Sequence, residues 1–287
     1  NSALQAVGVA AAVRDREGQP VVYCGVGDGT TQQGEYLEAV GEAVRRRLPV
    51  LFVVQDNRYA ISTPTAGSTF FSLPSGRARD FLGLPIEEVD GRDPATAFDR
   101  LGQAVAAMRA DRAPRLLVFS VERLSSHTSA DDQRIYRDAD ELARAELAGD
   151  PVRNLRQGLL AAGVAEAKLA AIEAELVAAV AEAQAAALAG SEPAASVTAK
   201  AAVPAELVQA ASESSPAADA APLTIREALN GVLRERLAHD ERVVVYGQDI
   251  ADPKGDVFGV TRGLSAEFPQ RVFNAPLTES TIVGTGI

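Results

Sequence analysis

The chain has 287 residues and is acidic, with 39 aspartates and glutamates against 28 lysines and arginines and a formal net charge of -11. A chain of this length buries a sizeable core and has room for two domains. The acidic balance argues against a general nucleic-acid surface and against an anionic membrane as the partner. Cys24 is the only cysteine, which excludes an intrachain disulfide and a cysteine zinc cluster and predicts a buried thiol in a reducing compartment.

The first half of the chain alternates apolar runs with helix-patterned segments. Residues 21–26 form a short run rich in β-branched side chains, and residues 35–48 follow with apolar side chains at helical spacing. Residues 50–55, 95–110 and 115–122 continue the alternation as a strand, an amphipathic helix and a strand. This order predicts an α/β fold, in which a parallel sheet is covered by helices on both faces.

The composition changes twice after residue 155. Residues 155–190 are rich in alanine, and large apolar residues recur at three- and four-residue steps between 169 and 180, which predicts a packed helix. Residues 191–222 are dominated by Ala, Ser and Pro and carry too few large apolar groups to offset the entropy of ordering. We therefore predict a first domain over 1–190, a linker over 191–222 and the start of a second, similar α/β domain over 223–287.

The second domain opens with a helix signal. Thr224 and Glu227 have the spacing of a capping box, in which a hydroxyl and a carboxylate satisfy free N–H groups at the start of a helix. Apolar residues then line one face, and residues 243–246 follow as a strand. After a glycine-rich stretch the run RVFN leads to APLTESTIVGTG. The chain begins without Met and stops inside this pattern, so we expect both ends to be cuts through a longer polypeptide.

No run of about 18 apolar residues occurs, and no basic segment precedes an apolar one at the start of the chain. We therefore expect a soluble, cytoplasmic protein that does not enter a membrane.

Asp28 lies between Gly27 and Gly29, directly after the first apolar run. Glycines allow the backbone to approach a phosphate closely, and a helix that begins near Gly34 points its free N–H groups toward the same crevice. An Asp-Gly pair after a strand is also typical of an ordinary turn. The position of the second polar residue separates these interpretations.

Asn57 follows the run at 50–55 in the same way. Mg²⁺ prefers near-octahedral oxygen coordination with one or two protein carboxylates together with phosphate oxygens. The Asp28 carboxylate, the Asn57 amide oxygen and the main-chain carbonyl of Tyr59 meet that demand. Together the two positions predict a Mg²⁺-diphosphate site.

The combined pattern resembles a family fingerprint. GDG, 26 intervening residues, then DN followed by YAIST is similar to the thiamine diphosphate motif of the E1 α subunits of 2-oxo acid dehydrogenase complexes. Asp56 departs from the usual NN of that motif, and Gln55 stands where some members place a diphosphate-binding arginine. The resemblance implies a thiamine diphosphate-binding fold with thiamine diphosphate and Mg²⁺ as cofactors. The residues implied to contact the cofactor are Gly27, Asp28, Gly29, Asn57, Tyr59, Ile61 and Glu279.

Two further stretches resemble catalytic segments of the same family. ERLSSHTSADDQRIYRD is similar to its active-site loop and places His127 at the catalytic histidine. A histidine in a polar loop is by default a solvated surface group, so this assignment depends on the resemblance. Residues 223–287 resemble the beginning of the E1 β subunit and place Glu279 at its catalytic glutamate. Without that context, a glutamate at a helix start is simply favoured by the macrodipole.

The resemblance implies a fused α–β chain that pairs as a homodimer, equivalent to an α₂β₂ heterotetramer. Its implied reaction is the oxidative decarboxylation of pyruvate or a branched-chain 2-oxo acid, with transfer of the acyl group to the lipoyl domain of an E2 acyltransferase. Glu279 would hydrogen-bond the cofactor pyrimidine, and His127 would stabilise the bound substrate and assist acyl transfer.

Two other functions remain open at the level of sequence. One is a noncatalytic module that binds the diphosphate or assembles subunits. The other, a nicotinamide-binding Rossmann domain, is disfavoured because no GxGxxG follows the first strand.

Overall fold

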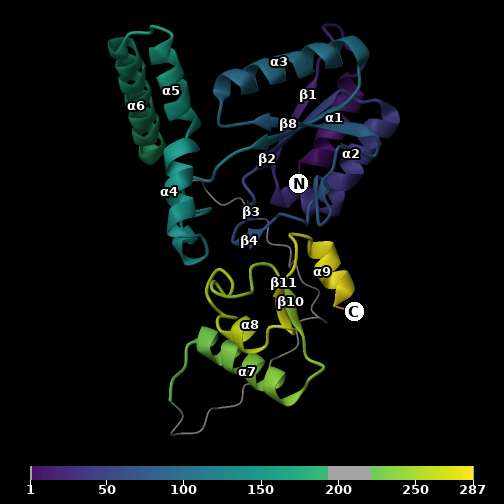
Figure 1. Ribbon diagram of the computed structural model, residues 1–287, viewed down its shortest axis with the longest axis vertical. Coiled ribbons are helices and arrows are strands. Elements are labelled where there is room, and N and C mark those ends of the chain that lie inside the picture. Colours follow the sequence, from purple (N-terminus) through teal and green to yellow (C-terminus); the bar gives the residue numbers. More distant parts are fainter. Residues whose placement is uncertain (1, 193–220, 287) are drawn as a thin grey trace. The chain divides into compact units, whose positions relative to one another are not determined.

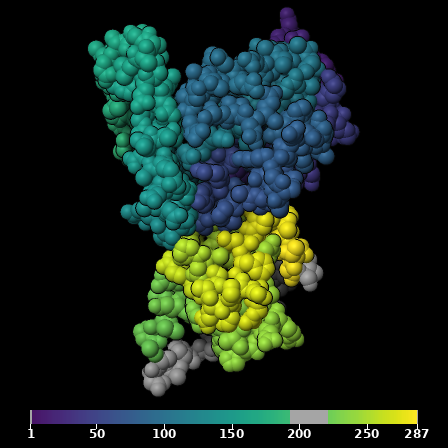
Figure 2. Space-filling model, in the orientation of Figure 1, coloured from purple at the N-terminus to yellow at the C-terminus, as the bar shows by residue number. Residues whose placement is uncertain are grey.

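A computed structural model describes residues 2–192 and 221–286 of the chain (Figures 1 and 2). Residues 193–220, most of the predicted linker, lie outside the described residues. Two compact units are present. The first combines the chain up to Gln157 with the chain from Thr224 onward, and the second runs from Gly158 to Leu223.

A five-stranded sheet in the order β1-β2-β9-β8-β7 forms the centre of the first unit. Four strands run parallel, and the short β7 pairs antiparallel with β8 at one edge. The strands are β1 (Val22–Gly27), β2 (Val50–Asp56), β9 (Arg115–Ser120), β8 (Leu84–Asp90) and β7 (Asp80–Phe81). The prediction of a parallel α/β sheet is confirmed. β8 was not predicted, because its sequence LPIEEVD is half acidic and buries only its first and sixth residues.

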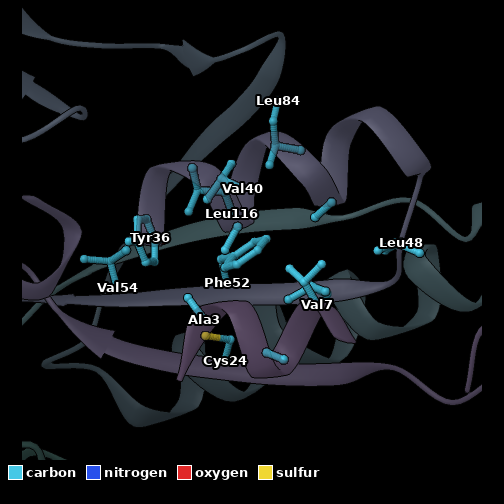
Figure 3. Packing of buried hydrophobic residues seen from close by; sticks show 14 of the residues in the cluster. Ala3, Val7, Cys24, Tyr36, Val40, Leu48, Phe52, Val54, Leu84 and Leu116 are labelled. Atoms are coloured by element: carbon cyan, nitrogen blue, oxygen red, sulfur yellow. The ribbon is translucent and has the colours of Figure 1, made fainter. Parts of the chain in front are cut away.

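Helices cover both faces of this sheet, as predicted (Figure 1). They are α1 (Ala3–Val13), α2 (Gly34–Arg46) and α3 (Pro94–Asp111). Strand β2 contributes to the core on both faces of the sheet, because alternate side chains of a strand point to opposite faces. Phe52 packs in one core cluster with α1 and α2, whereas Leu51 and Val53 pack in another with α3. In Figure 3, Tyr36 of α2 packs against Phe52, with the ring centroids 5.8 Å apart.

The predicted buried thiol is confirmed, because Cys24 is buried and free within the first of these clusters.

Short elements lie in the loops between the main strands and helices. Two are the 3₁₀ turns η1 (Gly29–Gln32) and η2 (Gln133–Ile135). Two hairpins pair β3 (Tyr59–Ala60) with β4 (Thr63–Pro64) and β5 (Ser72–Leu73) with β6 (Gly76–Arg77), and helix α4 (Ala139–Ala148) follows η2.

The segment from residue 224 contributes a small α/β piece to the first unit. Its elements are α7 (Ile225–His239), β10 (Val245–Gly247), α8 (Leu264–Glu267), β11 (Val272–Asn274) and α9 (Glu279–Thr285). The predicted capping box is confirmed, since Glu227 N donates to Thr224 Oγ1 and Thr224 N donates to Glu227 Oε2. Leu237 is buried with Leu264 and Val272, but Ile225 at the other end of the predicted helix face is exposed.

The alanine-rich region forms two helices instead of one. α5 (Pro151–Ala161) ends just before Gly163, which has a φ of +87°. A glycine in this left-handed conformation commonly ends a helix. α6 (Glu166–Ala189) follows. In the described structure Leu169 is buried but Leu176 and Val180 are largely exposed, so the predicted packed face was wrong for most of α6. No helix within residues 2–192 and 221–286 has both the length and the apolar character needed to cross a bilayer.

Candidate functional site

Asp28 and Asn57 lie at the same edge of the sheet. β1 and β2 are adjacent and parallel, and their register pairs Gly27 with Gln55. Asp28 N donates to the carbonyl oxygen of Gln55 across this edge at 3.2 Å. The structure therefore brings the two predicted ligand positions together at the carboxyl ends of neighbouring strands, where α/β sheets form ligand sites.

The carboxylate of Asp28 is buried and has no basic partner among the described residues. Only 2% of the residue is exposed, and Thr65 Oγ1 donates to Asp28 Oδ2 at 2.7 Å. The pKa of Asp28 is raised to about 6, chiefly by burial and also by the nearby charge of Asp56, against the lowering effect of the Thr65 hydrogen bond. A buried carboxylate of this kind is stabilised in its charged form by a bound cation, so the Asp28 side chain fits the predicted metal.

The turn after β2 places the other predicted ligands. Tyr59 N donates to Asn57 Oδ1 at 3.0 Å, which closes an Asx turn, and Arg58 inside it has a φ of +72°. An amide oxygen accepts two hydrogen bonds, so Asn57 Oδ1 keeps one acceptor position for a cation. Ile61 also has a positive φ, of +54°, and its carbonyl accepts from Arg123 Nη1 at 2.7 Å.

Gly27 and Gly29, which flank Asp28, have different surroundings. A Cβ on Gly29 would lie 2.9 Å from Ala60 Cβ and 3.5 Å from Leu277 Cδ2, so glycine permits the close approach of η1 to β3. A Cβ on Gly27 would meet nothing within 4 Å. Open space therefore lies beside the Gly27 backbone, as the predicted approach of a diphosphate requires.

Asp56 is buried and paired with a cation. Arg77 Nη2 donates to Asp56 Oδ2 at 2.9 Å, and Arg58 N donates to Oδ1 at 3.0 Å. Sequence reasoning missed Arg77 and Thr65, because neither belongs to the fingerprint and both reach the site through the loop after β4. Hydroxyl residues between 62 and 69 were the only signal for Thr65.

Glu279 begins α9 and lies next to η1. Gln33 Nε2 donates to Glu279 Oε2 at 2.7 Å, and Leu277 N donates to Gln32 Oε1 at 2.7 Å. The Glu279 carboxylate is exposed. The structure thus brings a predicted catalytic residue of the second segment to the turn that begins at Asp28. The glutamines lie inside the GDGTTQQGE motif but had no predicted role.

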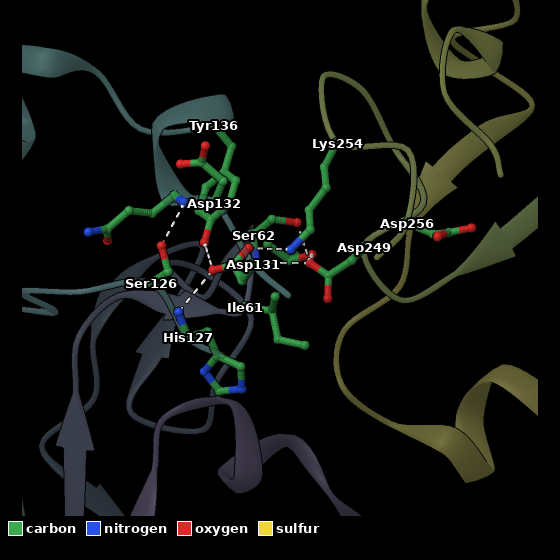
Figure 4. Close-up of polar contacts among 12 residues, drawn as sticks. Ile61, Ser62, Ser126, His127, Asp131, Asp132, Tyr136, Asp249, Lys254 and Asp256 are labelled. Atoms are coloured by element: carbon green, nitrogen blue, oxygen red, sulfur yellow. Dashed lines mark hydrogen bonds and ion pairs between the residues drawn. The ribbon is translucent and has the colours of Figure 1, made fainter. Parts of the chain in front are cut away.

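His127 lies on the loop between β9 and α4, which we call the His127 loop (residues 124–138). The histidine is exposed, and its main-chain N donates to Asp131 Oδ2 at 2.9 Å. Tyr136 donates its hydroxyl to the same oxygen at 2.7 Å (Figure 4). Arg123 donates to the Tyr136 hydroxyl at 2.7 Å and also holds the Ile61 carbonyl. The loop is therefore linked to the turn after Asn57 rather than to Asp28.

Residues 1–196 match the protein family described as "Dehydrogenase E1 component", and residues 221–287 match "Transketolase, pyrimidine binding domain". The chain is 33% identical over 150 residues to a pyruvate dehydrogenase E1 component subunit alpha of Zymomonas mobilis subsp. mobilis, which covers 52% of the chain and 42% of the relative. It is 34% identical over 167 residues to a 3-methyl-2-oxobutanoate dehydrogenase subunit alpha of Mycobacterium tuberculosis, covering 58% and 45%.

A pyruvate dehydrogenase E1 component subunit alpha of Staphylococcus aureus is 34% identical over 157 residues, which are 54% of the chain and 42% of the relative. The chain thus spans less than half the length of these curated relatives.

Proposed function

The chain belongs to the dehydrogenase E1 component family, and we propose that it forms part of a thiamine diphosphate- and Mg²⁺-dependent enzyme that oxidatively decarboxylates a 2-oxo acid. The observation that carries this proposal is the buried Asp28 carboxylate, which has no cationic partner among the described residues and lies beside Asn57 and the Gln33–Glu279 contact. The relatives named above make pyruvate and 3-methyl-2-oxobutanoate the candidate substrates.

Asp28, the Asn57 amide and the Tyr59 carbonyl would hold Mg²⁺, and the backbone at Gly27 and Gly29 would accommodate the diphosphate. When bound, thiamine diphosphate supplies the carbon nucleophile and the electron sink for loss of CO₂. The protein's part at this end of the site is binding and charge neutralisation. The buried Asp28 is suited to it because a cation removes the cost of its charge.

Glu279 would hold a proton shared with the N1′ atom of the cofactor pyrimidine. Its exposed carboxylate is fixed on one side by Gln33 and leaves its other oxygen available. His127, also exposed, would stabilise the substrate and assist transfer of the acyl group to a lipoyl domain of an E2 acyltransferase. Because Glu279 and Asp28 come from different segments, neither segment forms the site alone. We further propose two domains joined by the linker at 191–222, and pairing of two such chains.

Titration calorimetry with thiamine diphosphate and Mg²⁺ tests the binding site. We expect saturable binding that Asp28→Ala abolishes. Asp15→Ala is the matched control, because Asp15 is a highly exposed carboxylate outside the motif, and it is expected to bind as the unaltered chain does. Equal binding by the Asp28 variant contradicts the metal assignment.

Decarboxylation in the complete enzyme tests the catalytic assignment. Glu279→Gln is expected to abolish turnover of pyruvate and of 3-methyl-2-oxobutanoate while Mg²⁺ binding persists, because Glu279 is not a predicted metal ligand. Retained turnover would exclude the role given to Glu279.

A noncatalytic diphosphate-binding or assembly module is the second candidate. Binding without turnover in the complete enzyme would support it.

A further inference from the structure

A buried ion pair joins the His127 loop to the segment from residue 224. Lys254 Nζ lies 2.5 Å from Asp131 Oδ1, and the two side chains are 5% and 2% exposed. In Figure 4 the lysine extends from the loop after β10 toward Asp131. The two residues are 123 positions apart in the chain. Asp131 lies in the stretch that resembles the family's active-site loop, but Lys254 was assigned no role by the resemblance, and neither residue takes part in the proposed chemistry.

The Asp131 carboxylate connects Lys254 to the main chain of His127. One carboxylate oxygen accepts from Lys254, and the other accepts from the backbone N of His127 and from the Tyr136 hydroxyl. Burial alone raises the pKa of Asp131, but the hydrogen bonds from Lys254 and Tyr136 hold it below its usual range. The ammonium group also lies 5.3 Å from the centre of the Tyr136 ring. The carboxylate is therefore charged, and both of its oxygens accept hydrogen bonds.

Lys254 is itself held in place by the backbone around it. Gly255 has a φ of +65°, and a Cβ there would lie 2.3 Å from the Arg262 backbone, so this turn closes tightly on Arg262. Arg262 Nε donates to the Lys254 carbonyl at 3.3 Å. Lys254 thus projects from a rigid base.

A second contact from the same loop reaches the turn after Asn57. Asp249 Oδ1 accepts from Ser62 N at 3.0 Å, from Thr63 Oγ1 at 2.9 Å and from the Ser62 hydroxyl. Asp256 N donates to the Asp249 carbonyl at 2.8 Å, which ties the two ends of the loop together. Residues 249–256 consequently hold both the turn after Asn57 and the His127 loop.

We propose that Lys254 is a positioning residue for His127, acting through Asp131. The ion pair fixes the orientation of the Asp131 carboxylate, and this carboxylate holds the main-chain N of His127. The His127 loop is then ordered only when the segment from residue 224 is packed against it. A buried carboxylate that loses its cation keeps the full cost of its desolvated charge, so removal of Lys254 favours opening of the loop toward water. The catalytic consequence rests on the proposed function, whereas the positioning itself does not.

Hydrogen exchange of the full chain, followed by mass spectrometry without cofactor, tests the positioning. Lys254→Met keeps most of the side-chain length but removes the charge. We expect exchange in residues 124–132 to become faster by roughly tenfold or more, while β2 and β9 stay protected. Lys254→Arg is expected to restore part of the protection. Lys168→Met, at an exposed lysine on α6, is the matched control and is expected to leave the loop unchanged.

A double variant covers the case in which Lys254→Met unfolds the chain. Lys254→Met with Asp131→Asn leaves no unpaired buried charge, and the asparagine oxygen still accepts from His127 N and the Tyr136 hydroxyl. Faster loop exchange in this variant supports the proposal, because only the link to Lys254 is lost. Exchange in residues 124–132 equal to that of the unaltered chain, in either folded variant, overturns it.

Activity separates this inference from the proposed function. In the complete enzyme, Lys254→Met is expected to lower kcat for acyl transfer to a lipoyl domain by about tenfold to hundredfold, with Mg²⁺ affinity unchanged because Lys254 touches no predicted ligand. Faster exchange in an enzyme that never decarboxylates a 2-oxo acid overturns the proposed function alone. Unchanged exchange in an active enzyme overturns the positioning role alone.

Discussion

Replacing Asp28 by asparagine should stabilise the metal-free protein at neutral pH while it removes the proposed carboxylate ligand of the metal. The carboxylate is 2% exposed, and no ion pair reaches it among the described residues. Asparagine has nearly the same shape, and its amide oxygen can still accept the Thr65 hydroxyl hydrogen bond. The substitution therefore removes a buried charge without creating a cavity.

The size and pH dependence of this effect follow from the raised pKa. Asp28 ionises near its usual 3.8 in the unfolded chain and near about 6 in the folded one. Between these values the folded state binds more protons, so the free energy of unfolding falls as pH rises. At about 1.4 kcal/mol per pH unit, the full cost is about 3 kcal/mol above pH 7. Well below the unfolded-state pKa of 3.8 both states are protonated and the cost disappears.

Urea denaturation in the presence of a chelator, at pH 4.5 and pH 7.5, measures the effect. The difference in unfolding free energy between Asp28→Asn and the unaltered chain should be about 1 kcal/mol at the lower pH and approach about 3 kcal/mol at the higher. Subtracting the two curves cancels the titration of every group that does not interact with Asp28. A difference that does not change with pH, or a variant that is less stable at pH 7.5, would refute the reasoning.

Two additions sharpen this experiment. Thr65→Val removes a hydrogen bond to the charged form of Asp28, so we expect it to destabilise the chain more at pH 7.5 than at pH 4.5, by about 1.5 to 3 kcal/mol. Saturating Mg²⁺ and thiamine diphosphate should stabilise only the chain that retains Asp28, which reduces or reverses the order of stability at pH 7.5.

Three further substitutions have distinct expected outcomes. Gly29→Ala should lower the free energy of unfolding by about 1 to 3 kcal/mol, because its Cβ would lie 2.9 Å from Ala60 Cβ, and urea titration checks this. Thr224→Ala should cost about 1 kcal/mol by removing the hydroxyl of the capping box, and unchanged stability would show that the cap contributes nothing. Gln33→Leu should lower decarboxylation in the complete enzyme without weakening Mg²⁺ binding in calorimetry, since Gln33 contacts only the Glu279 carboxylate of the predicted site residues.

The parts of the fold that were predicted from sequence depend on local patterns. β2 begins with five apolar residues, Val50 to Val54, and the polar residues Gln55 and Asp56 complete it, so its extent was predicted to within one residue. The capping box at Thr224 and Glu227 depends on residues three positions apart. Long periodic segments and caps are determined within a few turns of chain, and for that reason they were predicted with nearly the observed bounds.

The parts that were missed depend on contacts across long stretches of chain. Thr65 reaches Asp28 from 37 positions away, and Lys254 reaches Asp131 from 123 positions away. Nothing in the local sequence selects one lysine or threonine from the others as a partner. β8 and the helix break at Gly163 were missed for a different reason. Pairing in the sheet overrode the weak strand propensity of β8, and a single left-handed glycine overrode the helix propensity around Gly163.

Asp56 shows how one departure from the family pattern alters the electrostatics of the site. A carboxylate at this buried position requires a cation, and Arg77 provides it at 2.9 Å. The pairing does not remove the effect on the neighbouring site, because the Asp56 charge still raises the pKa of Asp28. With Asp in place of the usual Asn, the metal-free site therefore carries a larger cost of charge. A divalent cation at Asp28 would relieve that cost, so Asp56 is expected to strengthen cation binding at the proposed Mg²⁺ site.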